Sequence, residues 1–233
     1  MKCIWEHNGQ DTLLHSADLI GAYTRGENLR IALQKMPDEV AAYAQWSGNV
    51  CEPDPSFEII QEKQSDLQIS DADSDILFDS EKAPLTQEEY EKLKALALKS
   101  ASDFYTLYTS IPDKRVSCLP IRNTFYGRAP RTAQDMYEHT KNVNSYYFGE
   151  IGVDVDNQGN IYDCRQRGFQ FLEQTADFLR NPVIEGSYGE LWSVRKMLRR
   201  FVWHDRIHAK AMYRMALQIF DKSQIANPFY FRV

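Results

Sequence analysis

The segment WHDRIHAKAMYRM, residues 203–215, sets two histidines, His204 and His208, into the apolar face of a predicted helix. Residues four positions apart lie on the same side of a helix, with their Cβ atoms about 5–6 Å apart. That is a usual spacing for two imidazoles that share one metal ion. A buried ring nitrogen without a partner costs on the order of 1–3 kcal/mol. The segment therefore predicts a core-facing helix whose histidines need a binding partner.

Helical periodicity continues through the second half of the chain. Apolar residues recur on one stripe in four stretches, residues 86–110, 132–149, 162–180 and 189–220. Thr86, with Glu89 three residues later, forms a capping-box pattern at the start of the first stretch. Four amphipathic helices favour an all-α four-helix bundle over residues 85–233.

A third histidine, His139, holds an inward position on the second of these stretches, between Met136 and Val143. If the bundle brings the two stripes together, three neutral imidazoles meet. A single histidine on an apolar face is more often a core residue bonded to a carbonyl than a metal ligand, and that interpretation stays open. A divalent metal would satisfy one nitrogen of each ring, which makes His139, His204 and His208 the candidate ligands.

Other ligand sites have weaker support in the sequence. A metalloprotease helix would carry Glu directly after the first histidine of the pair, and this chain has Asp205 there. The run DVDNQG, residues 154–159, resembles the start of a calcium loop, but its twelfth position is Arg165 instead of Glu. Arg195 and Arg199 are expected on a solvated or salt-bridged helix face, with an anionic ligand as the alternative.

Residues 1–64 predict a small α+β domain, a sheet with one helix packed on it. KCIWEHN and TLLHSAD are β-rich runs on either side of the hairpin signal Asn8-Gly9, and GAYTRGEN and SFEIIQE are further strand candidates. Apolar residues at helical spacing follow in residues 29–44, and Pro37 among them allows a kink or a break.

The stretch between the two regions is acidic. Residues 65–84, SDLQISDADSDILFDSEKAP, carry six acidic residues against one lysine and show little periodicity. This composition favours a solvated linker or a loosely packed arm over an ordered element.

The composition limits the class of protein. With 43% apolar and 26% charged residues, the chain is typical of globular proteins. Its net charge of −6 argues against nucleic acid as a partner. There is no run of 18 apolar residues to enter a membrane, and MKCIWEHNGQ lacks a leader's apolar segment, so we expect a cytoplasmic protein. The four cysteines are far apart, without a Cys-x-x-Cys motif, which favours reduced thiols.

Two segments together, YEHTKNVNSYYFGEIG and GELWSVRKMLRRFVWHDRIH, resemble the DinB-like metalloenzymes, a superfamily of small four-helix bundles. The resemblance covers roughly residues 86–220. That family binds a divalent metal through one histidine on its second helix and an H-x-x-x-H pair on its last. The resemblance therefore implies His139, His204 and His208 as metal ligands. Zinc and nickel are the ions we expect first, although imidazoles also suit copper and iron.

The segment SADLIGAYTRGENLRIALQKMPDEVAAY is similar to HicB-like antitoxin domains. It matches their strand, turn, T-x-G-(D/E) motif and helix, but Ser16-Ala17 stand ahead of Asp18 where the family has a proline. The resemblance implies a fold and carries no catalytic motif. Such domains can form a homodimer or bind a partner, and the DNA-binding module that accompanies some of them is not visible here.

Members of the DinB-like superfamily include thiol-dependent S-transferases. The resemblance thus implies a metal-dependent transferase that uses a low-molecular-weight thiol on small electrophiles. Three histidine ligands leave a coordination position open, as in catalytic sites. Asp135, one turn before His139, could orient that ring or be an exposed helix residue, and nothing in the sequence identifies a general base. Two alternatives stay open: a metal-dependent hydrolase, and a non-catalytic partner-binding or regulatory protein with a structural metal.

Overall fold

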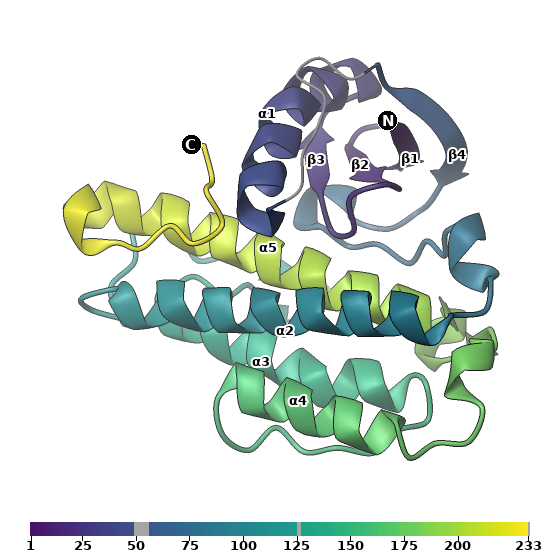
Figure 1. The fold of residues 1–233 in the computed structure, drawn as a ribbon. Coiled ribbons are helices and arrows are strands. Elements are labelled where there is room, and N and C mark those ends of the chain that lie inside the picture. Colours follow the sequence, from purple (N-terminus) through teal and green to yellow (C-terminus); the bar gives the residue numbers. More distant parts are fainter. Residues whose placement is uncertain (49–55, 125–126, 233) are drawn as a thin grey trace.

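The structure, a computed structural model, describes residues 1–48, 56–124 and 127–232. It is an α+β fold in which a four-stranded sheet with one helix comes first and helices follow (Figure 1). The α-helices are α1 (Leu29–Ser47), α2 (Gln87–Ser110), α3 (Ala133–Gly149), α4 (Ile161–Leu172) and α5 (Val194–Ile219). Short 3-10 helices cover Ile69–Asp71, Asp79–Lys82, Phe178–Arg180, Ser187–Gly189 and Lys222–Gln224. Within the described ranges, no helix combines the length and the apolar character needed to span a membrane.

The N-terminal sheet consists of β1 (Lys2–His7), β2 (Thr12–Ser16), β3 (Tyr23–Gly26) and β4 (Glu58–Gln64), in the order β3-β2-β1-β4. β1 pairs antiparallel with β2 and parallel with β4, and α1 packs against β2 and β3. The predicted turn joins β1 to β2: Gly9 has a φ of +86°, and Asn8 Oδ1 accepts the Asp11 N–H at 2.8 Å. The predicted small sheet with one helix is confirmed.

α1 runs without interruption through Pro37, where the sequence allowed a kink or a break. A proline removes one helical hydrogen bond, but both ends of α1 are capped. Asn28 Oδ1 accepts the Ile31 N–H at 3.1 Å, and Gly48 donates its N–H to Ala44 O at 2.9 Å. Residues on both sides of the proline are buried, so packing holds the two halves in one helix.

Helices α2 to α5 lie side by side below the sheet (Figure 1). α2 and α3 both pack against α5, and both also pack against α4. The helices predicted at residues 86–110 and 132–149 are confirmed as α2 and α3 to within one residue. α2 starts at the predicted capping box, where Thr86 Oγ1 accepts the Glu89 N–H at 3.1 Å and Glu89 Oε2 accepts the Thr86 N–H at 2.9 Å.

The helix predicted at residues 162–180 is too long. α4 ends at Leu172, turns follow, and only the short 3-10 helix Phe178–Arg180 returns to helical geometry. Leu179 is half-buried because it packs against the apolar core, and its carbonyl accepts the Leu85 N–H at 2.8 Å. Its apolar character therefore reflects contact with the start of α2 and not a longer α4.

The last helix begins five residues later than the predicted start at residue 189. Ser193 is its N-cap, and Ser193 Oγ accepts the Lys196 N–H at 3.1 Å. The residues before it turn in a short hairpin. The short strands outside the main sheet are β5 (Asn123–Thr124) with β6 (Gly127–Arg128), and β7 (Ile184–Glu185) with β8 (Leu191–Trp192).

The acidic segment of residues 65–84 is packed, so the prediction of a solvated linker or loosely packed arm is wrong. Phe78 is buried, and the guanidinium of Arg199 lies 3.8 Å from the centre of its ring. Glu81 is also buried, and its carboxylate accepts Arg199 Nε at 2.5 Å. The basic partner comes from α5, more than a hundred residues later, which local composition could not indicate.

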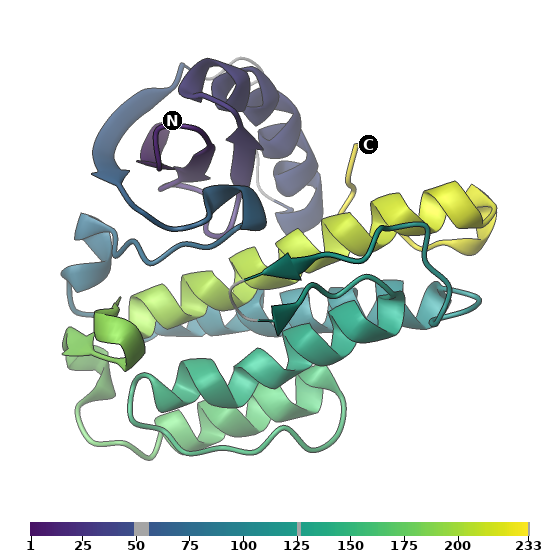
Figure 2. The ribbon, with the colours of Figure 1, turned by 180° about the vertical axis from the view of Figure 1, so that it is seen from behind.

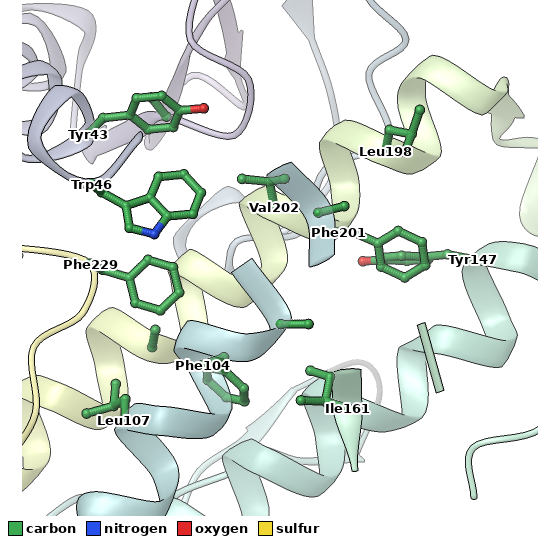
Figure 3. Packing of buried hydrophobic residues seen from close by; sticks show 14 of the residues in the cluster. Tyr43, Trp46, Phe104, Leu107, Tyr147, Ile161, Leu198, Phe201, Val202 and Phe229 are labelled. Atoms are coloured by element: carbon green, nitrogen blue, oxygen red, sulfur yellow. The ribbon is translucent and has the colours of Figure 1, made fainter. Parts of the chain in front are cut away.

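One continuous apolar core joins the N-terminal region to the helices (Figure 3). Trp46 of α1 meets Phe229 of the C-terminal segment, with ring centroids 5.4 Å apart. Phe201 of α5 packs on Tyr147 of α3 at 5.3 Å. Residues of α1, α3, α5 and the C-terminal segment thus belong to a single apolar cluster.

Candidate metal centre

The helix that carries the H-x-x-x-H pair, α5, lies between the N-terminal sheet and the other helices (Figure 1). Charged side chains between the two histidines have partners of opposite charge. Arg206 Nη2 donates to Glu39 Oε1 at 2.5 Å, and Asp205 accepts two bonds from Arg165 at 2.5 and 3.1 Å. These ion pairs fix the rotation of α5, because each of them points to a different neighbouring element.

The structure brings His139 of α3 to His204 and His208 of α5. The ring centroid of His139 lies 5.1 Å from that of His204 and 4.7 Å from that of His208. The ring centroids of His204 and His208 are 4.5 Å apart. One ligand nitrogen from each ring lies within 4.8 Å of the others. Across residues 1–48, 56–124 and 127–232, this is the only group of three His, Cys, Asp or Glu side chains with such geometry. The group could hold a metal ion.

The chemistry of the three rings fits a divalent ion. His204 Nδ1 is buried and has no hydrogen-bond partner among the described residues. Imidazole nitrogens bind zinc at about 2.0–2.1 Å, which places two ligands of one ion at most about 4.2 Å apart. Inward movements of less than about 1 Å would bring the rings into this range. An ion would also remove the cost of the unpaired nitrogen.

Burial favours the neutral form of these imidazoles, which is the form that binds metals. Desolvation lowers the pKa of His139 below its ordinary value of 6.5. Desolvation, with the neighbouring imidazoles acting in the same direction, holds the pKa of His204 and of His208 well below 6.5. The ring nitrogens are therefore available as ligands at neutral pH.

The histidine group opens toward solvent on one side. His204 is buried, His208 is half-buried and His139 is exposed. A hollow of about 510 Å³ lies beside His139, between the end of β6 and the first turn of α3. Figure 2 shows β5 and β6 on this side of the molecule, next to α5 and the start of α3. Three ligands with one accessible side are typical of catalytic sites and not of closed structural ones.

Asp135 and Asp205, the two carboxylates next to the candidate ligands in the sequence, both have structural roles. Asp135 caps α3, because its Oδ2 accepts the Thr132 N–H at 3.1 Å, and it makes no hydrogen bond to His139 among the described contacts. Asp205 is buried in its pair with Arg165, and the described hydrogen bonds of its carboxylate do not include one to the three rings. Neither carboxylate is placed to act on a ligand of the metal site.

Two arginines considered as anion ligands are also used internally. Arg195 pairs with Glu89 at 2.9 Å, and Arg199 pairs with Glu81 at 2.5 Å. The expectation of a salt-bridged face is confirmed for both. Residues 154–159 belong to no metal-binding group of the kind found at the three histidines, within the part of the chain that the structure describes.

Arg128 and Arg131 line the hollow next to His139, and the sequence analysis missed both. They come from GRAPRT, directly before α3. The available signal was a pair of basic residues just ahead of a helix that carries a candidate ligand. A loop has no periodicity that would show which way its side chains point, so this signal was weak.

Comparisons with known proteins found no family model, no curated protein and no solved structure that matches the chain.

Proposed function

We propose that this protein is a metalloenzyme that binds one divalent ion through His139, His204 and His208. The observation that supports this most is the meeting of three imidazoles from two helices, where one of the imidazoles has a buried nitrogen without a hydrogen-bond partner among the described residues. In this proposal α2 to α5, within residues 85–233, form a four-helix bundle of the DinB-like type. Residues 1–64 form a HicB-like domain that can dimerise or bind a partner.

The reaction we propose joins a low-molecular-weight thiol to a small electrophile. Zinc or nickel is the expected ion, since both accept imidazole ligands. When bound, the ion would supply the positive charge that keeps a thiol in its nucleophilic thiolate form. The chain holds the thiol and the electrophile on the open side of His139. There the thiol loses its proton to solvent, its sulfur forms a bond to the carbon of the electrophile, and the carbon–leaving-group bond breaks, so that the leaving group departs with the bonding electrons. The buried ring of Tyr147 packs edge-on against His204, with ring centroids 5.9 Å apart, and supports that imidazole from the core side.

A non-catalytic scaffold is the second candidate, and one observation favours it. α5 is a structural centre of the molecule, because Arg206 binds Glu39 of α1 and Arg199 binds Glu81 of the acidic segment. In this second candidate the metal has no catalytic role and only fixes the position of α5. Such a metal would resist chelators, and its removal would melt the helices. A catalytic metal would exchange readily and would keep an accessible coordination position.

Metal analysis tests the ligand assignment. We expect about one divalent ion per chain in the wild type and almost none in a His204→Ala/His208→Ala double variant. His7→Ala is the matched control, because His7 lies in β1 and pairs with Glu62 at 3.1 Å, away from the three rings. Equal metal content in the wild type and the double variant would remove the assignment.

A screen of thiols tests the reaction. Metal-loaded protein is mixed with an electrophile and with bacillithiol, coenzyme A, glutathione or cysteine, and loss of the electrophile is followed. We expect turnover that needs both the metal and one of these thiols. Inactivity with all four, together with a metal that resists chelators, would favour the scaffold. Turnover of an ester without any thiol would favour a hydrolase.

A further inference from the structure

The hollow beside His139 offers more positive than negative charge. It is lined by residues 128–132, Asp135 and His139, and its volume of about 510 Å³ is typical of small-molecule sites. Because His139 is one of its walls, a molecule in the hollow lies against one of the three grouped imidazoles. The hollow is therefore a natural place for the part of a substrate that does not react.

Two arginines, Arg128 and Arg131, line this hollow. Arg131 donates from Nε to Leu119 O at 3.1 Å, which holds the side chain in place and leaves its terminal nitrogens available. Arg128 is exposed, and its side chain makes no hydrogen bond or ion pair with any residue that the structure describes. A guanidinium is always charged and presents a fork that matches carboxylate and phosphate oxygens.

Asp135 opposes only part of this charge. Its Oδ2 accepts the backbone N–H groups of Thr132 at 3.1 Å and of Arg131 at 3.4 Å. Among the described residues that line the hollow, Asp135 is the only one with an acidic side chain. Two arginines against one aspartate leave the hollow positive even before a metal ion is added.

We infer that the small molecule that reaches the three-histidine site carries a carboxylate or phosphate group, and that Arg128 and Arg131 bind this group. The inference rests on the proposed function for the presence of the metal, and it names the substrate class. The anionic group belongs either to the thiol or to the electrophile. Both sources share the same chemistry in the hollow.

The thiol is tested with cobalt(II), whose visible absorption reports both its binding to the histidines and the binding of a thiolate. Mercaptosuccinate and thioglycerol have similar size and differ in charge. We expect wild-type protein to bind mercaptosuccinate about tenfold more tightly than thioglycerol. Arg128→Ala should lower this preference by about threefold to tenfold, and the charge reversal Arg128→Glu should abolish it. Neither variant should change the affinity for cobalt.

Arg122→Ala is the matched control, because Arg122 is an exposed arginine next to β5 that pairs with Asp71 and does not line the hollow. It should keep the full preference. A direct bond from mercaptosuccinate carboxylates to cobalt would give a preference that Arg128→Glu leaves intact, and this result would overturn the inference for the thiol.

The electrophile is tested with iodoacetate and iodoacetamide, with thioglycerol as the thiol. A faster enzymatic reaction of iodoacetate that Arg128→Glu removes would assign the anionic group to the electrophile. If neither the thiol pair nor the electrophile pair shows a preference that depends on Arg128, the inference is wrong.

The inference can fail separately from the proposed function. Cobalt that binds at about one per chain without any charge preference would leave the metal site intact and remove only the role of the arginines. If the protein binds no cobalt, the proposed function fails. A titration of metal-free protein with inorganic phosphate then still tests whether the hollow binds an anion. We then expect shifts of the Arg131 Nε–H resonance that Arg128→Glu suppresses, and no shift would overturn the inference.

Discussion

Glu6 of β1 is a carboxylate enclosed by the protein. Its side chain is fully buried, and its Oε2 accepts the Ser74 Oγ–H at 2.5 Å. His15 Nε2 of β2 lies 3.7 Å from the same oxygen, and the Asp75 N–H is donated to Oε1 at 3.3 Å. Glu6 thus connects the sheet to the acidic segment of residues 65–84, for which the composition favours a solvated linker or a loosely packed arm.

This environment makes the stability of the protein depend on pH. Burial alone would raise the pKa of Glu6, but His15, the Ser74 hydroxyl and the Asp75 N–H lower it from 4.5 to about 2. A carboxyl with a lowered pKa in the folded state stabilises the fold above about pH 4.5, and this contribution is lost as the pH falls toward about 2. We predict that Glu6→Gln lowers the free energy of unfolding by roughly 1–3 kcal/mol at neutral pH. The difference from the wild type should shrink below about pH 4.5.

Urea unfolding at a series of pH values from about 7 to about 3 measures this effect. Glu62→Gln is the control, because Glu62 is exposed on β4 and its removal should change stability by less than about 1 kcal/mol at any pH. His15 adds its own loss of stability below pH 6.5, since burial lowers its pKa. The comparison of the two variants separates the contribution of Glu6. A constant difference across the whole pH range would contradict the role of its ionisation.

At the scale of elements, the packing of α3 against α4 depends on Gly168. A Cβ atom at that position would lie 2.1 Å from the ring of Phe148. That ring has little room to move, because the rings of Phe169 and Phe201 lie 5.4 and 5.2 Å from it. The absence of a side chain at Gly168 therefore sets how closely these two helices pack.

We predict that Gly168→Ala destabilises the protein by about 1–3 kcal/mol. Helix propensity alone would favour alanine by about 1 kcal/mol, so the sign of the change separates packing from propensity. Gly149→Ala is the matched control, because nothing lies within 4 Å of a Cβ at that residue of α3. Its stability should stay the same or rise slightly. Urea unfolding of both variants decides the matter, and a stabilised Gly168→Ala variant would show that the contact relaxes easily.

The helices could be predicted where the chain carries its own boundary signals. The start of α2 followed from Thr86 and Glu89, which cap the helix with their own atoms. The end of α4 could not be predicted, because Leu179 continues the apolar spacing while its carbonyl bonds to Leu85 in another element. The cap at Ser193 is a local signal that the prediction overlooked.

The candidate site, like the helices, could be predicted only where local geometry determines it. Two histidines four residues apart share a helix face by geometry alone, so the pairing of His204 with His208 needed no tertiary information. The approach of His139 depends on the packing of α3 against α5. The positions of Arg128 and Arg131 depend on a loop, where neighbouring elements decide the direction of each side chain.

Across the whole molecule, α5 connects the two regions through a buried ion pair. Glu39 of α1 accepts Arg206 Nη2 at 2.5 Å and Lys210 Nζ at 3.0 Å. The Arg206 guanidinium also lies about 5 Å from the rings of Tyr43 and Trp46, both from α1. Since Arg206 lies between the two histidines of the H-x-x-x-H pair, the N-terminal region helps to hold the three-histidine group in position.

This arrangement predicts that the two regions unfold together. Glu39→Gln leaves the buried Arg206 without a counter-charge, which should lower the free energy of unfolding by about 3–5 kcal/mol. Hydrogen exchange in low urea, followed by mass spectrometry, should show the same loss of protection in peptides from β2 and from α2. Asp38→Asn is the control, because the neighbouring Asp38 pairs with Arg232 at 3.6 Å on the surface and should contribute less than about 1 kcal/mol. A loss of protection confined to residues 1–64 would mean that the N-terminal region opens without the helices and does not stabilise the histidine site.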